Sequence, residues 1–426
     1  MIHGAMRFLT IASLLLTWAA AAVAALSPME QKIVACIESH PEDFARDLQE
    51  AVMVDSATEN LAGVRRMAEV FGRQLMALGF ESRFVELPAS TGRSGHLVAE
   101  HRGTRGKRLL LLGHLDTVYP GGNYRREGDT AFGSGVADMK GGDVVMIHAL
   151  RALQEAGELA DTQIIVVMSG DEEAPGSPVD VVRHDLIAAA ARSDLALAFE
   201  SAIGRTATVA RRGSISWLLE VQGTTAHSSG IFSAAVGAGS VYEMARILSA
   251  FYTELRKLDG VTLNSALVAG GAEGDLTRTG GKVAGKTNII PQRTLVRGDL
   301  RFVSAAQLVE AQAAMQAIVA HGNLPRTSAV LKFDEGYAAM PPSPGNYALL
   351  AQLDQASRDL GLGEITAFDP RARGAGDISF VSPPLPALDG LGLGGKGEHT
   401  LLESTDLTTA PELIKRTAIL LHRLTR

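Results

Sequence analysis

Three short runs of apolar residues in the first half of the chain end in glycine or in acidic residues. They span residues 108–114, 163–168 and 194–199. Continuous apolar runs of this length predict strands that are buried on both faces, as in parallel sheets. Segments with the apolar spacing of helices lie between them, at 142–156 and 178–192. This alternation predicts an α/β fold with a mixed, mostly parallel sheet and helices on both faces.

The pattern changes after residue 201, where strands and longer helices follow in a different order. The predicted elements are a strand at 214–221, a helix at 237–258, strands at 262–268 and 293–302, a helix at 305–320 and a strand at 329–333. The order β-α-β-β-α-β is that of the ferredoxin-like split motif. We therefore predict an inserted ferredoxin-like α+β domain at 206–335, within a first domain made of residues 25–205 and 336–426.

Composition narrows the classes of function. Hydrophobic residues make up 46% of the chain and charged residues 20%, which favours a folded core over disorder. The net charge is −7 and no Lys/Arg-rich run occurs, so nucleic acid is not an expected partner. The single cysteine, Cys36, excludes an intramolecular disulfide and a thiolate zinc site. Any metal must be held by His, Asp and Glu.

The first residues have the pattern of a targeting segment. Arg7 precedes an apolar stretch at 8–23, and Ala22-Val23-Ala24 has the small side chains of a cleavage site. We predict a cleaved signal peptide at 1–24 and a secreted or periplasmic protein without a stable membrane anchor. An uncleaved anchor is the alternative interpretation.

Candidate metal ligands follow each of the three buried strands. His114 and Asp116 end the first, Glu172 and Glu173 follow the second, and Glu200 follows the third. Ligands gather beyond the carboxyl ends of the strands in an open parallel sheet, so these side chains are expected at one edge.

Two glycine-rich loops add Asp138 and His399 to this group. A zinc site of this chemistry needs three protein ligands and an open position, and two neighbouring ions need a shared carboxylate. Five ligand residues, one of them bridging, are therefore sufficient for two ions. Taken singly, each residue could equally form a surface hydrogen bond or a salt bridge.

Together these motifs resemble the di-zinc metallopeptidase and aminoacylase family, and most of all its bacterial glutamate carboxypeptidases of the carboxypeptidase G type. The resemblance rests on His114-x-Asp116, Gly-Ser-Gly-x-x-Asp138-Met-Lys-Gly-Gly, Glu172-Glu173, Glu200 and His399, in order and at similar spacing. It implies one zinc on His114, Asp138 and Glu200, and another on Asp138, Glu173 and His399. It also implies that Asp116 orients the His114 ring and that Glu172 is the general base.

The resemblance extends to the inserted domain, which it identifies as a dimerisation or lid domain. His227 lies in a loop that, in dimeric members, reaches the partner subunit's active site. Asn288 and Arg301 match contacts to the substrate carboxylate and oxyanion, and Gly374 matches a loop that closes on the substrate backbone. A cap, a turn and an exposed strand charge are the alternative interpretations of His227, Asn288 and Arg301.

The implied activity is that of a zinc-dependent carboxypeptidase. It would release a C-terminal, glutamate-like amino acid from a small peptide or N-acyl amino acid by a metal-bridged hydroxide, with two Zn²⁺, or Co²⁺ or Mn²⁺, per chain of a homodimer. An N-acyl-amino-acid deacylase of the same family and a non-catalytic binding protein with this fold are the alternatives. The predicted export favours scavenging of peptides over a biosynthetic deacylase. The sequence lacks the Gly-x-Ser-x-Gly motif of many serine hydrolases.

Overall fold

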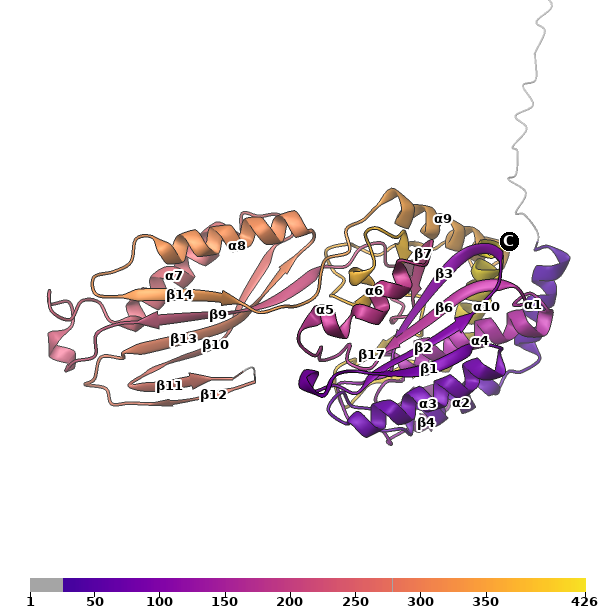
Figure 1. The fold of residues 1–426 in the computed structure, drawn as a ribbon, viewed down its shortest axis with the longest axis horizontal. Helices are drawn as coiled ribbons and strands as arrows, with labels where there is room; N and C mark the ends of the chain where they lie inside the picture. Colours follow the sequence, from indigo (N-terminus) through magenta and orange to yellow (C-terminus); the bar gives the residue numbers. More distant parts are fainter. Residues whose placement is uncertain (1–25, 278) are drawn as a thin grey trace, which may run out of the picture.

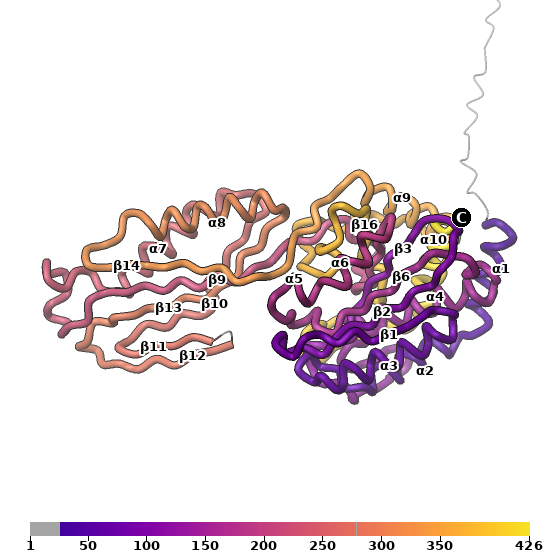
Figure 2. Tube along the Cα trace, in the orientation of Figure 1, coloured from indigo at the N-terminus to yellow at the C-terminus, as the bar shows by residue number. Residues whose placement is uncertain are grey.

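The chain folds into two lobes joined side by side (Figure 1). The structure is a computed structural model that describes residues 26–277 and 279–426. The predicted signal peptide lies outside these residues. The chain enters the smaller lobe after β8 (Thr206–Ala207) and returns to the larger one after β14 (Ser328–Phe333) (Figure 2). No described helix is both long and apolar enough to cross a membrane.

A six-stranded sheet forms the centre of the larger lobe. Its order is β1 (Glu81–Glu86), β2 (Gly95–His101), β6 (Thr162–Ser169), β3 (Arg105–His114), β7 (Leu195–Ala198) and β16 (Ala387–Leu388). The last four strands are parallel and the first two are antiparallel to their neighbours. The mostly parallel sheet predicted from the apolar runs is confirmed.

Alternate residues of β3 enter two different cores, which explains its continuous apolar sequence. Leu109 and Leu111 face the larger core, whereas Leu110 and Leu112 face a smaller one. The helices of the larger core are α1 (Pro28–Glu38), α2 (Asp43–Val52), α3 (Leu61–Ala77), α4 (Lys140–Ala156), α9 (Pro344–Asp359) and α10 (Ala410–Leu424). Helix α6 (His184–Ala190) packs on the other face, and the short helix α5 (Val179–Val182) precedes it.

The prediction of a single helix at 178–192 is wrong in one respect. The segment forms α5 and α6, and Arg183 lies between them with φ −106°. The Arg183 side chain is buried against Asp171 and Asp377. Apolar spacing could not reveal this burial of Arg183, because its partners come from other segments.

The smaller lobe has the predicted β-α-β-β-α-β order. Its antiparallel sheet has the order β10 (Thr262–Gly271), β13 (Arg293–Phe302), β9 (Gly213–Gln222) and β14 (Ser328–Phe333), and its helices are α7 (Ser240–Leu255) and α8 (Ala305–Ala320). Trp217, Phe251 and Met315 lie in its separate core. A further hairpin, β11 (Glu273–Leu276) and β12 (Gly281–Ala284), was not predicted, because its sequence is polar and glycine-rich.

A small antiparallel sheet joins distant parts of the larger lobe. Its order is β17 (Gly395–Lys396), β18 (Ser404–Asp406), β5 (Thr130–Phe132) and β4 (Arg125–Glu127). Strand β18 pairs with β5 across more than 270 residues of sequence, as in the register Ser404↔Phe132. This pairing places the loops that carry Asp138 and His399 next to each other.

Candidate active site

The five residues predicted as metal ligands lie together at the carboxyl edge of the parallel strands. The structure forms two groups, His114–Asp138–Glu200 and Asp138–Glu173–His399, and in each group the possible ligand atoms lie within 4.8 Å of one another. Strands β6, β3 and β7 are neighbours, which explains why residues at their ends meet. Asp138 belongs to both groups.

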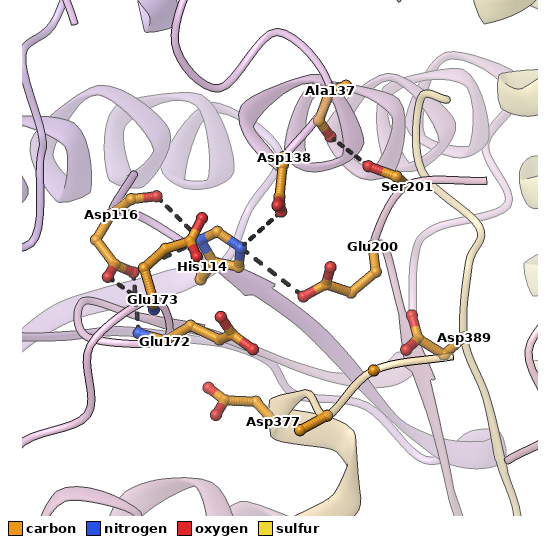
Figure 3. Close-up of polar contacts among 12 residues, drawn as sticks. His114, Asp116, Ala137, Asp138, Glu172, Glu173, Glu200, Ser201, Asp377 and Asp389 are labelled. Carbon is orange, nitrogen blue, oxygen red and sulfur yellow. Dashed lines mark hydrogen bonds and ion pairs between the residues drawn. The ribbon is translucent and has the colours of Figure 1, made fainter. Parts of the chain in front are cut away.

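The two oxygens of Asp138 point to different histidines. Oδ1 lies 3.3 Å from His114 Nε2, and Oδ2 lies 3.0 Å from His399 Nε2. Glu200 Oε1 is 3.8 Å from His114 Nε2, and Glu173 Oε2 is 3.2 Å from His399 Nε2. A carboxylate directed to two sites in this way has the geometry of a bridging ligand. Figure 3 shows the contacts of His114 with Asp138 and Glu200.

The electrostatics of the cluster fit divalent cations. Burial raises the pKa of Glu200 to about 7 and that of Glu173 to about 6. Hydrogen bonds with Asp138 and Glu173 raise the pKa of His399 to about 11, so a positive charge is favoured at this point. Imidazole and carboxylate ligands without thiolates suit zinc, and also cobalt or manganese.

Asp116 supports the site mainly through the backbone that follows β6. Its Oδ1 accepts the Glu172 N–H at 3.0 Å, and its Oδ2 accepts the Glu173 N–H at 3.1 Å and the Thr58 hydroxyl at 2.7 Å. His114 Nδ1 lies 3.0 Å from the Asp116 carbonyl oxygen and 3.5 Å from its carboxylate. Asp116 therefore contacts the second nitrogen of His114, as expected, and also holds both glutamates.

Glu172 lies beside the two groups but belongs to neither. Figure 3 shows its carboxylate in the space between Glu200 and Asp377. Burial, and then the charge of Glu200, raise its pKa well above that of an exposed glutamate. A carboxylate with a raised pKa beside a candidate metal centre has the properties of a general base.

Glu403 is a supporting residue that sequence reasoning missed. Its carboxylate accepts the N–H groups of Gly135, Ala137 and Asp138 at 2.8, 2.9 and 2.9 Å, which fixes the Asp138 loop. Glu403 directly precedes β18. No pattern in the sequence marks it, because its contact with the Asp138 loop depends on the pairing of β18 with β5.

A buried arginine was also missed. Arg211 lies 3.4 Å from Glu200 through Nη2 and forms an ion pair with Asp389 through Nε. Its charge lowers the pKa of Glu200, in opposition to burial. The sequence shows Arg211 only as one of two adjacent arginines, so nothing distinguished it from a surface charge.

Comparison with known proteins agrees with this geometry. Residues 110–424 match the peptidase family M20/M25/M40. The chain belongs to this family. It is 25% identical over 392 residues to carboxypeptidase G2 of Pseudomonas sp. (strain RS-16), covering 88% of each chain. It is 26% identical over 356 residues to the succinyl-diaminopimelate desuccinylase of Sphingopyxis alaskensis, covering 79% of this chain and 87% of the relative.

Solved structures share the fold of this M20 family member. A tripeptidase from Staphylococcus aureus aligns with a TM-score of 0.69 at 18% identity, covering 93% of this chain and 99% of its own. An M20 metallo-carboxypeptidase from Sulfolobus solfataricus aligns with a TM-score of 0.67 at 16% identity, covering 89% and 98%. The chain is therefore a hydrolase of a typically dimetallic metallopeptidase family, with a second domain inserted into the lobe that holds the candidate metal ligands.

The predicted substrate-binding residues of this M20 protein are divided between two places. Gly374 lies near the metal ligands, since its carbonyl oxygen accepts a hydrogen bond from Arg211 Nη1 at 3.2 Å. His227 and Asn288 lie together, because the backbone of Ser228 donates to the Asn288 carbonyl oxygen at 2.9 Å. His227 is exposed, and its Nδ1 lies 2.8 Å from the Ser229 hydroxyl oxygen.

Arg301 lies at the opposite end of the inserted sheet from His227 and Asn288. Gln222, at the end of β9 that leads to His227, pairs with Arg293, whereas Arg301 pairs with Ser214 near the catalytic domain. Ten residues of strand separate these ends, which is about 30 Å at 3.3 Å per residue. Arg301 is bound to Asp299 at 2.8 Å. One chain therefore does not bring His227 and Asn288 to its own Glu172.

Proposed function

We propose that this M20 hydrolase is a zinc-dependent carboxypeptidase that releases a C-terminal, glutamate-like amino acid from a small peptide or N-acyl amino acid. The observation that carries the proposal is the pair of ligand groups sharing Asp138, with Glu172 beside them. Similarity to carboxypeptidase G2 over 88% of both chains supports the choice of a carboxypeptidase reaction.

Each residue has a distinct part in this reaction. His114, Asp138 and Glu200 would hold one divalent ion, and Asp138, Glu173 and His399 the other. When bound, the ions polarise the scissile carbonyl and lower the pKa of water. Glu172 removes a proton from the attacking water and delivers it to the leaving nitrogen.

Substrate binding falls to the inserted domain in this proposal. The planar guanidinium of Arg301 suits a carboxylate, which it can bind through two parallel hydrogen bonds. Asn288 assists it, His227 stabilises the oxyanion, and the loop of Gly374 closes on the substrate backbone. Because His227 and Asn288 lie far from Glu172 in the same chain, we propose that a homodimer supplies them from the other subunit.

A deacylase is the second candidate. Similarity to succinyl-diaminopimelate desuccinylase over 79% of this chain favours it. Both reactions cleave an amide beside a carboxylate-bearing amine, so the metal ligands do not separate them. We propose export to the periplasm or the medium from the pattern of residues 1–24, and this location favours peptide scavenging.

A release assay over matched substrates tests the function. One series holds the acyl group constant and varies the C-terminal residue among glutamate, aspartate, leucine and lysine. A second holds glutamate constant and varies the acyl group among acetyl, succinyl, benzoyl and aminoacyl groups. The carboxypeptidase proposal predicts strong dependence on the first series and weak dependence on the second. The opposite pattern would identify a deacylase, and Glu172→Gln controls for contaminating activity.

A further inference from the structure

Asp377 holds a carboxylate oxygen in the active site that no described residue satisfies. The side chain is 7% exposed, and Oδ1 accepts a hydrogen bond from Arg183 Nε at 2.8 Å. Oδ2 is buried and has no hydrogen-bond partner among residues 26–277 and 279–426. An unsatisfied buried acceptor lowers stability, so its presence in a native site calls for an explanation.

The surroundings hold this oxygen in a fixed position next to Glu172. Arg183 also binds Asp171 at 2.6 Å and donates to the Tyr337 hydroxyl at 3.3 Å. The Tyr337 hydroxyl in turn donates to the Glu172 carbonyl oxygen. One network of side chains therefore supports both Asp377 and the backbone of Glu172.

The carboxylates of Asp377 and Glu172 share one space. Figure 3 shows the carboxylates of the two side chains next to each other, on the same side of His114. Two acceptors next to each other favour a donor between them, and the scissile amide has one donor, its N–H.

We propose that Asp377 Oδ2 accepts a hydrogen bond from the nitrogen of the scissile amide and holds the leaving amine as it becomes an ammonium group. This role rests on the proposed amide hydrolysis. It makes Asp377 a catalytic residue that distinguishes a nitrogen leaving group from an oxygen leaving group.

The proton balance of the reaction explains why a second carboxylate is useful. Water adds to the carbonyl, and its first proton passes through Glu172 to the nitrogen as the C–N bond breaks. The second proton passes from the new carboxyl group to the nitrogen, so the products are a carboxylate and an ammonium ion. Asp377 gains no proton, but its charge stabilises the positive charge that develops on nitrogen.

An ester analogue isolates this contact. Replacing the amide nitrogen by oxygen, with the same acyl group and a 2-hydroxy acid in place of the amino acid, removes the donor. For Asp377→Asn we expect kcat/KM to fall about 10- to 100-fold with the amide but less than about threefold with the ester. The Asn side-chain oxygen can still accept from Arg183, and metal content should stay at the wild-type value.

Asp171→Asn is the matched control. Asp171 binds the same arginine, but its second oxygen accepts the Gly176 N–H at 2.9 Å and does not face the substrate. This variant should leave the ratio of amide to ester activity unchanged. Equal losses on both substrates in Asp377→Asn, or a changed ratio in Asp171→Asn, would overturn the role of Asp377 while leaving the proposed function intact.

A measurement on the wild-type enzyme covers the case in which the variant does not fold. The released amino acid should inhibit about 10-fold more strongly than the 2-hydroxy acid of the same shape, because only the ammonium group pairs with Asp377. Equal inhibition would contradict the proposal. If the wild type cleaves no amide in the substrate panel, the proposed function is wrong, and the role of Asp377 that depends on it is wrong as well.

Discussion

At the scale of single residues, two adjacent glutamates have different surroundings and should have different functions. Glu173 lies 3.2 Å from His399, whereas Glu172 belongs to neither ligand group. We expect Glu172→Gln to retain two metal ions per chain and to lose about 10²–10⁴-fold in kcat, because an amide cannot accept the proton. Glu173→Gln should instead lose one ion. Metal analysis with kinetics checks both, and exchanged phenotypes would reverse the assignment.

Substitution of Glu403 tests whether the backbone around Asp138 must be held in place for metal binding. Its carboxylate accepts three backbone N–H groups, and Glu403→Gln would turn an amide NH₂ toward some of these donors. We expect metal affinity to fall about 10- to 100-fold, as with other groups that orient metal ligands. Competition with a chelator measures this affinity. Glu398→Gln, beside His399 but outside the Asp138 loop, is the control and should bind metal normally.

At the scale of secondary-structure elements, helices α2 and α4 are joined by a buried ion pair. Asp47 accepts hydrogen bonds from His148 at 2.9 Å and Arg151 at 3.0 Å. Although burial opposes it, these contacts lower the pKa of Asp47 to about 2. Since the pKa is lower in the folded state than the ordinary value of 3.8, the stabilisation is complete above pH 3.8 and is lost as the pH falls toward 2.

Asp47→Asn should therefore destabilise the protein in a pH-dependent way. We expect a loss of about 1–2 kcal/mol in the free energy of unfolding at pH 7, which shrinks below pH 3.8. Urea unfolding of both proteins at several pH values measures the difference. The exposed Asp180→Asn is the control. A difference that stays constant down to pH 2.5 would show that the ion pair is not its cause.

Some of the secondary-structure elements and site residues could be predicted from the sequence, and others could not. Strand β3 could be predicted because Leu109 to Leu112 are buried on both faces, and such burial leaves a continuous apolar signal. Strands β17 and β18 leave none, since they are short and form only by pairing across distant segments. The five candidate ligands could be predicted because they follow strands or lie in glycine-rich loops. Glu403 and Arg211 could not, because their contacts exist only in the folded chain.

At the scale of the whole molecule, the position of His227 makes the dimer testable. His227 lies about 30 Å along the inserted sheet from the end that adjoins the catalytic domain, so its own Glu172 is out of reach. If two subunits exchange these loops, each active site combines Glu172 of one chain with His227 of the other. A two-fold dimer would form two such sites, because the same surfaces meet twice.

Mixing two inactive variants tests this arrangement. Glu172→Gln and His227→Ala should each have little activity alone. In a dimer of one chain of each kind, one site has both mutations and the other has both native residues, so co-folding equal amounts should restore roughly a quarter of the wild-type activity. Light scattering confirms the dimer, and a mixture that is never co-folded is the control. A fully active monomer, or no recovery in a purified mixed dimer, would exclude the shared site and leave the metal assignments unaffected.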